Sequence, residues 1–112
     1  LAPMPRGIVS TCTATVGDGV TVAALRAALH AAYDDEPFVH VLPEGQWPQT
    51  SSVGGTNAAH LQVALDAHSG RAVVVSAIDN LGKGAAGQAL QNANLLLGLP
   101  ETMGLTSNGV AP

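Results

Sequence analysis

The first half of the chain shows two kinds of periodic apolar pattern. Residues 8–16, IVSTCTATV, alternate between two faces and are rich in Thr and Val, which predicts a β-strand. Residues 21–33 carry apolar side chains every three or four positions, which predicts an amphipathic helix with Thr21 as its N-cap. The short apolar run at residues 38–42, FVHVL, predicts a second strand.

The second half begins without a period and then becomes regular again. Residues 43–57 hold prolines, glycines and hydroxyl side chains, and a loop of this length in a small domain is usually functional or disordered. Two apolar runs flanking a short Gly-containing link predict an antiparallel hairpin of about 60–67 with 71–78. A helix is expected over about 83–97. This order predicts an α+β fold with a mixed, largely antiparallel sheet and helices on one face.

Composition indicates one domain with a partly covered surface. The chain has 112 residues, which fits a single domain spanning 1–112. Hydrophobic residues make up 46% of it, so the chain is not a disordered tail. Charged residues make up only 11%, against roughly 25% in ordinary soluble domains. We therefore expect another domain or subunit to cover part of the surface.

Charge and hydropathy exclude several classes of function. The net charge is −4 and the four Lys and Arg residues form no cluster, so a nucleic-acid interface is not expected. No apolar run approaches the roughly 20 residues of a membrane span, and no signal peptide is evident at the start. A single cysteine is compatible with a reducing, cytoplasmic location. The start, LAPMPRG, lacks an initiator Met, as expected of a domain excised from a longer protein.

Residues with reactive side chains give little sign of catalysis. Cys12 lies in the first strand pattern on the face shared with Ile8 and Val16, so we expect a small buried hydrophobe rather than a reactive thiolate. No two histidines lie four residues apart on one helix, and no pair of cysteines accompanies them. A zinc site is therefore not expected from the four histidines, His30, His40, His60 and His68.

The stretch between the last predicted strand and the last predicted helix is more informative. Asp79 and Asn80 end the strand, and the turn that follows contains Gly82, Lys83 and Gly84. Free backbone N–H groups at a helix start favour an anion or a polar ligand. Glycines in such a turn also allow the helix to pack closely against a sheet. The pattern leaves both interpretations open: a surface that docks a ligand or domain, or tight packing of helix on sheet.

Three segments in sequence order carry a resemblance to a known family. They are residues 1–16, LAPMPRGIVSTCTATV, residues 38–66, FVHVLPEGQWPQTSSVGGTNAAHLQVALD, and residues 77–102, AIDNLGKGAAGQALQNANLLLGLPET. All three resemble the C-terminal part of N-acetyl-gamma-glutamyl-phosphate reductases, NADP-dependent enzymes of arginine biosynthesis, and the resemblance extends over the whole chain. It implies the fold of the glyceraldehyde phosphate dehydrogenase-like C-terminal domain, with residues 80–112 as the returning helix and tail.

The resemblance also implies what this chain contributes and what it lacks. The family's Rossmann domain, its nucleophilic Cys and its acid/base His precede this segment, so we expect no catalytic residue and no metal here, and no activity or NADP binding by the chain alone. Asn80 is expected to contact the nicotinamide; the alternative is that Asn80 merely caps the next helix. Arg6 is expected beside the substrate pocket, where a guanidinium suits a carboxylate or phosphate.

Two functions therefore compete at this point. The first is the substrate-binding and dimerisation part of a reductase that converts N-acetyl-glutamyl phosphate to N-acetyl-glutamate semialdehyde. The second is a stand-alone, non-enzymatic binding or oligomerisation module that reuses the same domain. Both predict a homo-oligomer, which we expect to form through the sheet, because the strand at 71–78 is apolar on both faces.

Overall fold

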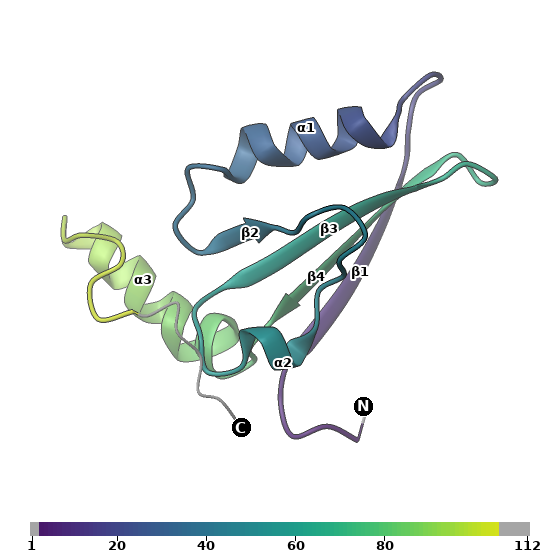
Figure 1. Cartoon of the computed structure of the whole chain (residues 1–112). Helices are drawn as coiled ribbons and strands as arrows, with labels where there is room; N and C mark the ends of the chain where they lie inside the picture. The colour runs from purple at the N-terminus through teal and green to yellow at the C-terminus, as the bar shows by residue number, and fades with distance from the viewer. Residues whose placement is uncertain (1–2, 106–112) are drawn as a thin grey trace.

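Four strands form one sheet in the computed structural model, which describes residues 3–105 (Figure 1). Three neighbouring strands pair in antiparallel fashion, and the fourth, at one edge of the sheet, pairs in parallel. Their spatial order is β1 (Ile8–Thr15), β4 (Arg71–Ile78), β3 (Ala59–Asp66) and β2 (Val39–Val41). The predicted α+β class with a mixed, largely antiparallel sheet is confirmed. The tail at 106–112, which the resemblance includes, lies outside the described residues.

The predicted hairpin forms the centre of the sheet. β3 and β4 pair antiparallel from Ala59 opposite Ile78 to Asp66 opposite Arg71, as the alternating runs predicted. Helix α1 (Val22–Tyr33) lies alongside β2 and β3 (Figure 1). It begins where expected, because the Thr21 hydroxyl oxygen accepts a hydrogen bond from the Ala24 N–H at 3.2 Å.

Two helical segments differ from the expected pattern. The loop expected at 43–57 contains a short helix, α2 (Thr50–Val53), which the sequence does not announce by any apolar period. The last helix starts as a π-helical turn, η1 (Gly82–Ala86), and continues as α3 (Gly87–Leu96). The helix predicted over 83–97 therefore exists, but its first turn is wider than an α-helix. In the described residues, no helix is long and apolar enough to cross a membrane.

The hydrophobic core within the chain is thin. Val53, Ala58 and Ala77 form its buried cluster, and α1 has no fully buried residue. The molecule measures 44 × 37 × 20 Å, and its radius of gyration of 15.4 Å exceeds the roughly 13 Å of a compact domain of this length. This open shape agrees with the expectation, drawn from composition, that other protein covers part of the surface.

The first strand corrects one expectation. Every residue of β1 is exposed, including Cys12, which the alternation had predicted to be buried. Alternation identifies which side chains share a face of a strand, but it does not identify what covers that face. β1 lies at the edge of the sheet, pairs only with β4, and receives no cover from the described residues.

Candidate functional site

The register between β1 and β4 brings the two ends of the chain together. Ile8 pairs with Ile78 in the antiparallel ladder, so the residues just before β1 lie opposite those just after β4. Arg6 and Gly7 consequently meet Asp79 and Asn80, although 73 positions separate them in sequence. The two site residues singled out from the sequence, Arg6 and Asn80, thus belong to one cluster.

Asp79 is the centre of this cluster. Its side chain is fully buried and accepts hydrogen bonds from three separate segments of the chain. Arg6 Nη2 lies 2.7 Å from Oδ1 and 2.6 Å from Oδ2, which makes a charge-assisted ion pair. The remaining donors are backbone N–H groups, those of Gly55, Leu81 and Gly82.

The environment of Asp79 keeps its carboxylate ionised. Burial by itself raises the pKa of Asp79, because a charged group loses hydration there. The hydrogen bonds from Arg6 and from the three backbone N–H groups outweigh that effect and hold the pKa well below its usual range. The negative charge is therefore a permanent part of the site at any physiological pH.

Asn80 faces the N-terminal segment. Its Oδ1 accepts a hydrogen bond from the Gly7 N–H at 2.8 Å, which fixes the orientation of the amide. Among the described residues, its Nδ2 has no hydrogen-bond partner. The cap of the following turn is made by Asp79, which accepts from the N–H groups of Leu81 and Gly82 at 2.8 Å each.

Two glycines, Gly82 in the turn and Gly87 at the start of α3, allow residues 56–57 to pack closely against the backbone. A Cβ at Gly82 would overlap the backbone carbonyl oxygen of Thr56, and a Cβ at Gly87 would overlap Oδ1 of Asn57. These glycines are explained by close packing of the turn and helix against residues 56–57. Tight internal packing, one of the two interpretations that the sequence left open, accounts for these two glycines.

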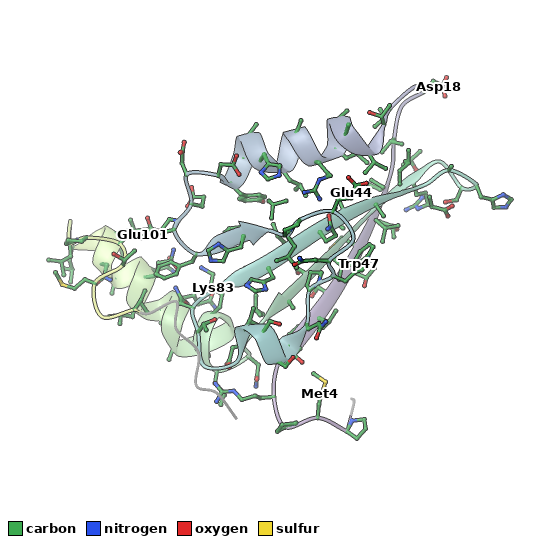
Figure 2. All side chains as sticks on the ribbon, in the orientation of Figure 1. Met4, Asp18, Glu44, Trp47, Lys83 and Glu101 are labelled. Carbon is green, nitrogen blue, oxygen red and sulfur yellow. The ribbon has the colours of Figure 1, made fainter. Side chains whose placement is uncertain are left out.

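A chain of polar side chains fixes α3 beside this turn. Gln91 Oε1 accepts from Lys83 Nζ at 2.6 Å and from Asn57 Nδ2 at 2.9 Å, while Gln91 Nε2 donates to Glu101 Oε1 at 2.5 Å. Lys83 and Glu101 lie on the side of the molecule where α3 projects (Figure 2). The Lys83 ammonium also lies 5.8 Å from the centre of the Phe38 ring. Lys83 is thus held by contacts within the chain.

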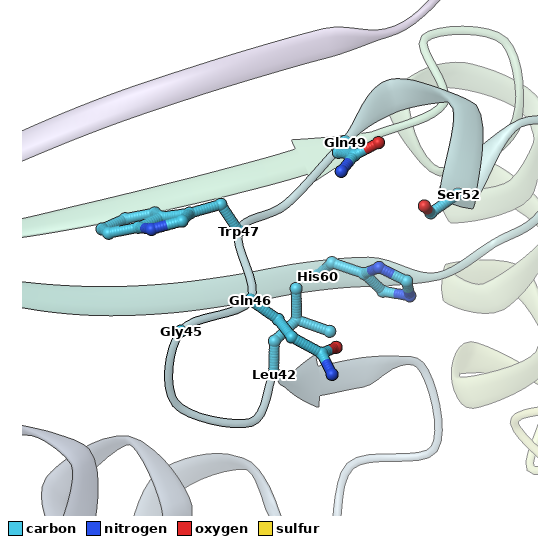
Figure 3. A pocket seen from close by; sticks show the side chains of 7 residues that line it. All are labelled: Leu42, Gly45, Gln46, Trp47, Gln49, Ser52 and His60. Carbon is cyan, nitrogen blue, oxygen red and sulfur yellow. The ribbon is translucent and has the colours of Figure 1, made fainter.

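A concave region, separate from the Asp79 cluster, lies over the sheet beside Trp47. It has a volume of about 480 Å³ and is open to solvent. Figure 3 shows the side chains that line it. Burial, and then the charge of neighbouring His40, lower the pKa of His60. The rings of His40 and His60 meet edge to face at 5.7 Å. The lining residues are Leu42, Gly45, Gln46, Trp47, Gln49, Ser52 and His60.

The remaining reactive residues lie outside both the Asp79 cluster and the concave region beside Trp47. Cys12 pairs with Val74 in the middle of β1, far along the strand from Arg6. His30 forms an exposed pair with Asp34 at 2.7 Å, and His68 lies in the β3–β4 turn. Within residues 3–105, no three His, Cys, Asp or Glu side chains are placed to hold a metal ion. The cluster at Asp79 consists of one ion pair and hydrogen bonds to backbone N–H groups, and neither Cys12 nor any of the histidines belongs to it.

The sequence offered Arg6 and Asn80 as candidates but did not point to Asp79, which contacts the segments of both. Asp79 was visible only as the polar end of a strand, and its partners Arg6 and Gly55 are distant in sequence. One signal was available: an acid directly before a glycine-rich helix start is a common acceptor for the free N–H groups there.

Comparison with known proteins identifies the class. Residues 1–80 match the family described as semialdehyde dehydrogenase, dimerisation domain, and the chain belongs to that family.

Within that class, the relatives are reductases. All 112 residues align with N-acetyl-gamma-glutamyl-phosphate reductase of Arthrobacter sp. (strain FB24) at 64% identity and with that of Streptomyces coelicolor at 63%. In both cases the alignment covers 100% of this chain and 33% of the relative, so the chain spans about a third of the curated relatives it matches.

Proposed function

We propose that this chain is the C-terminal, substrate-binding and dimerisation part of an NADP-dependent N-acetyl-gamma-glutamyl-phosphate reductase. The reaction would be reduction of N-acetyl-glutamyl phosphate to N-acetyl-glutamate semialdehyde in cytoplasmic arginine biosynthesis. The observation that carries the proposal is identity of 64% over the entire chain to a protein of that name. The nucleophilic Cys and the acid/base His would come from the other two-thirds of such an enzyme.

The proposed cofactor contact is Asn80. The Gly7 N–H occupies Oδ1, which leaves Nδ2 to donate to the carboxamide oxygen of a nicotinamide. The residues present therefore fit the group, and when bound, NADPH would supply the hydride. Arg6 would lie beside the substrate: its side chain is 37% exposed, so the part of the guanidinium that does not contact Asp79 can reach an anionic ligand.

A proposed contact with the rest of the enzyme lies at the end of α3. Four leucines there expose 41–86% of their surface, which is unusual for such large apolar side chains. We name Leu95, Leu96, Leu97 and Leu99 the leucine surface. An interface with a cofactor domain would bury it, and a homo-oligomer would cover the exposed β1 and sheet.

The alternative, a stand-alone binding module, is less well supported. The thin core, the exposed β1 and the leucine surface together favour a chain that is stable when joined to further protein. A module that works alone would be expected to bury these groups itself.

A chimera tests the proposal directly. This chain would replace the matched third of the Streptomyces coelicolor reductase, and NADP-dependent turnover would be measured with the semialdehyde and phosphate in the reverse direction. We expect turnover by the chimera and none by the chain alone. A folded chimera without turnover would refute the proposed function. Cys12→Ala should leave activity unchanged, because that thiol lies outside the site.

The role of Asn80 is tested within the same chimera. Asn80→Ala removes one hydrogen bond to the cofactor, so kcat/KM for the cofactor should fall about tenfold. Asn92→Ala, at an exposed position on α3, is the matched control and should change nothing. An active chimera in which both variants behave alike would show that Asn80 does not contact the nicotinamide, while the assignment as a reductase would stand.

A further inference from the structure

Two residues of the proposed site come from segments that have no regular structure of their own. Arg6 precedes β1, and Asn80 follows β4. A long side chain before a strand and an amide in a turn lose their positions easily unless other groups hold them. Asp79 contacts the segment of each: it pairs with Arg6, and it accepts from the N–H groups of the turn that begins at Asn80.

The hydrogen-bonding capacity of Asp79 is fully used. Oδ1 accepts from Arg6, Leu81 and Gly82, and Oδ2 accepts from Gly55 and contacts Arg6 as well. Two carboxylate oxygens offer about four lone-pair positions. An asparagine at this position would place an N–H₂ group against N–H donors, so neither an amide nor any other neutral side chain reproduces the arrangement. Both oxygens and the charge are required.

Only one nitrogen of the Arg6 guanidinium, Nη2, is bonded within the described residues. Nη2 contacts both oxygens of Asp79, and Nε is buried with no partner among the described residues. The guanidinium is therefore anchored by one nitrogen while its outer part stays accessible.

We infer that Asp79 is the positioning residue of this site. It holds the Arg6 guanidinium and the turn bearing Asn80 in one fixed arrangement and does not itself touch substrate or cofactor. The inference rests on the proposed function, since it assigns Arg6 and Asn80 to ligand binding. A carboxylate that served only to stabilise the fold would leave the kinetics of the folded enzyme unaltered.

Kinetics of the chimera give the first test. Asp79→Asn should lower kcat/KM for the acyl substrate about 100-fold per folded molecule, the order of loss expected from misplacing a binding group. Arg6→Met should lower it as well, and the double variant should lose little more than Asp79→Asn alone, because the two residues act as one unit. Asp66→Asn is the control: Asp66 also caps a turn but lies outside the site, so kinetics should not change.

Hydrogen exchange gives a second test that needs no activity. The Gly7 N–H is bonded to Asn80 Oδ1 and does not contact Asp79, so its protection reports where the Asn80 side chain lies. In the Asp79→Asn chimera, Gly7 should exchange at least about tenfold faster, a change that Asp66→Asn should not produce. Unchanged protection of Gly7, or unchanged kcat/KM in a folded Asp79→Asn enzyme, would overturn the inference. An inactive parent chimera would instead refute the proposed function, and Gly7 exchange would still decide the role of Asp79.

Discussion

Two aspartates of this chain perform the same local task in different surroundings. Asp66 ends β3 and accepts from the His68 N–H at 3.0 Å; Asp79 follows β4 and accepts from the Leu81 N–H at 2.8 Å. In each case the side chain bonds the backbone two residues further on, which is a common way to begin a turn. Hydrogen bonds lower the pKa of both carboxyl groups.

The difference lies in burial and in where the other partners come from. Asp66 is exposed, and its second partner is the nearby Ser69 hydroxyl. Asp79 is fully buried and adds Arg6 and Gly55, which lie 73 and 24 positions away. An exposed aspartate such as Asp66 can begin a turn with local partners alone. A buried aspartate such as Asp79 makes the same local bond and also holds distant segments of the chain together.

Removing the two carboxylates should therefore have unequal effects on stability. Asp79→Ala leaves three backbone donors and Arg6 without their acceptor, and we expect the free energy of unfolding to fall by about 3 kcal/mol. Asp66→Ala should cost far less, because water replaces the lost acceptor. Urea unfolding of both variants and the parent chain measures the difference, and equal losses would mean that the distant partners of Asp79 contribute nothing.

Glycines in the same two turns should respond in the same order. Gly82→Ala places a Cβ against the Thr56 carbonyl oxygen, and overpacking of this kind costs about 2 kcal/mol. Gly70, in the hairpin turn, has φ of +63° with open space around it, so Gly70→Ala meets only the backbone penalty of about 1 kcal/mol. Thermal melts of the two variants test this ranking, which fails if Gly70→Ala is the more damaging change.

The smallest expected difference between Asp79 and Asp66 is in how the free energy of unfolding depends on acid pH. An unfolded Asp has a pKa of about 3.9, so above that pH both states of the protein are ionised and the stabilisation is complete. As the pH falls below about 4, the unfolded chain binds protons that folded Asp79 does not. Stability then falls by at most about 1.4 kcal/mol per pH unit for this group, until the pH drops below the folded pKa.

Urea midpoints measured from about pH 5 to about pH 3 give the test. The curve should be flatter for Asp79→Ala than for the parent chain, while Asp66→Ala should flatten it less. A parent chain whose midpoint does not change over this range would contradict the lowered pKa of Asp79.

Local sequence patterns predicted the helices and strands, whereas the exposure of side chains and the contacts of the site depend on residues distant in sequence. The helix starting after Thr21 and the hairpin were predictable because caps, turn residues and alternation are written in neighbouring positions. The exposure of Cys12 was not, since cover depends on elements elsewhere in space. Arg6 and Asn80 came from a family resemblance, while the contacts of Asp79 required the register of β1 against β4.

The position of β1 beside β4 has a consequence for how the chain is made. The β3–β4 hairpin joins neighbouring segments and needs only a short loop to close. The Arg6–Asp79 contact closes a loop of 73 positions, so it cannot exist while the nascent chain ends before residue 79. The Arg6–Asp79 contact therefore forms only after β4 has been synthesised and β1 has paired with it. An assembled cluster therefore indicates that β1 and β4, the strands from the two ends of the chain, have paired in their final register.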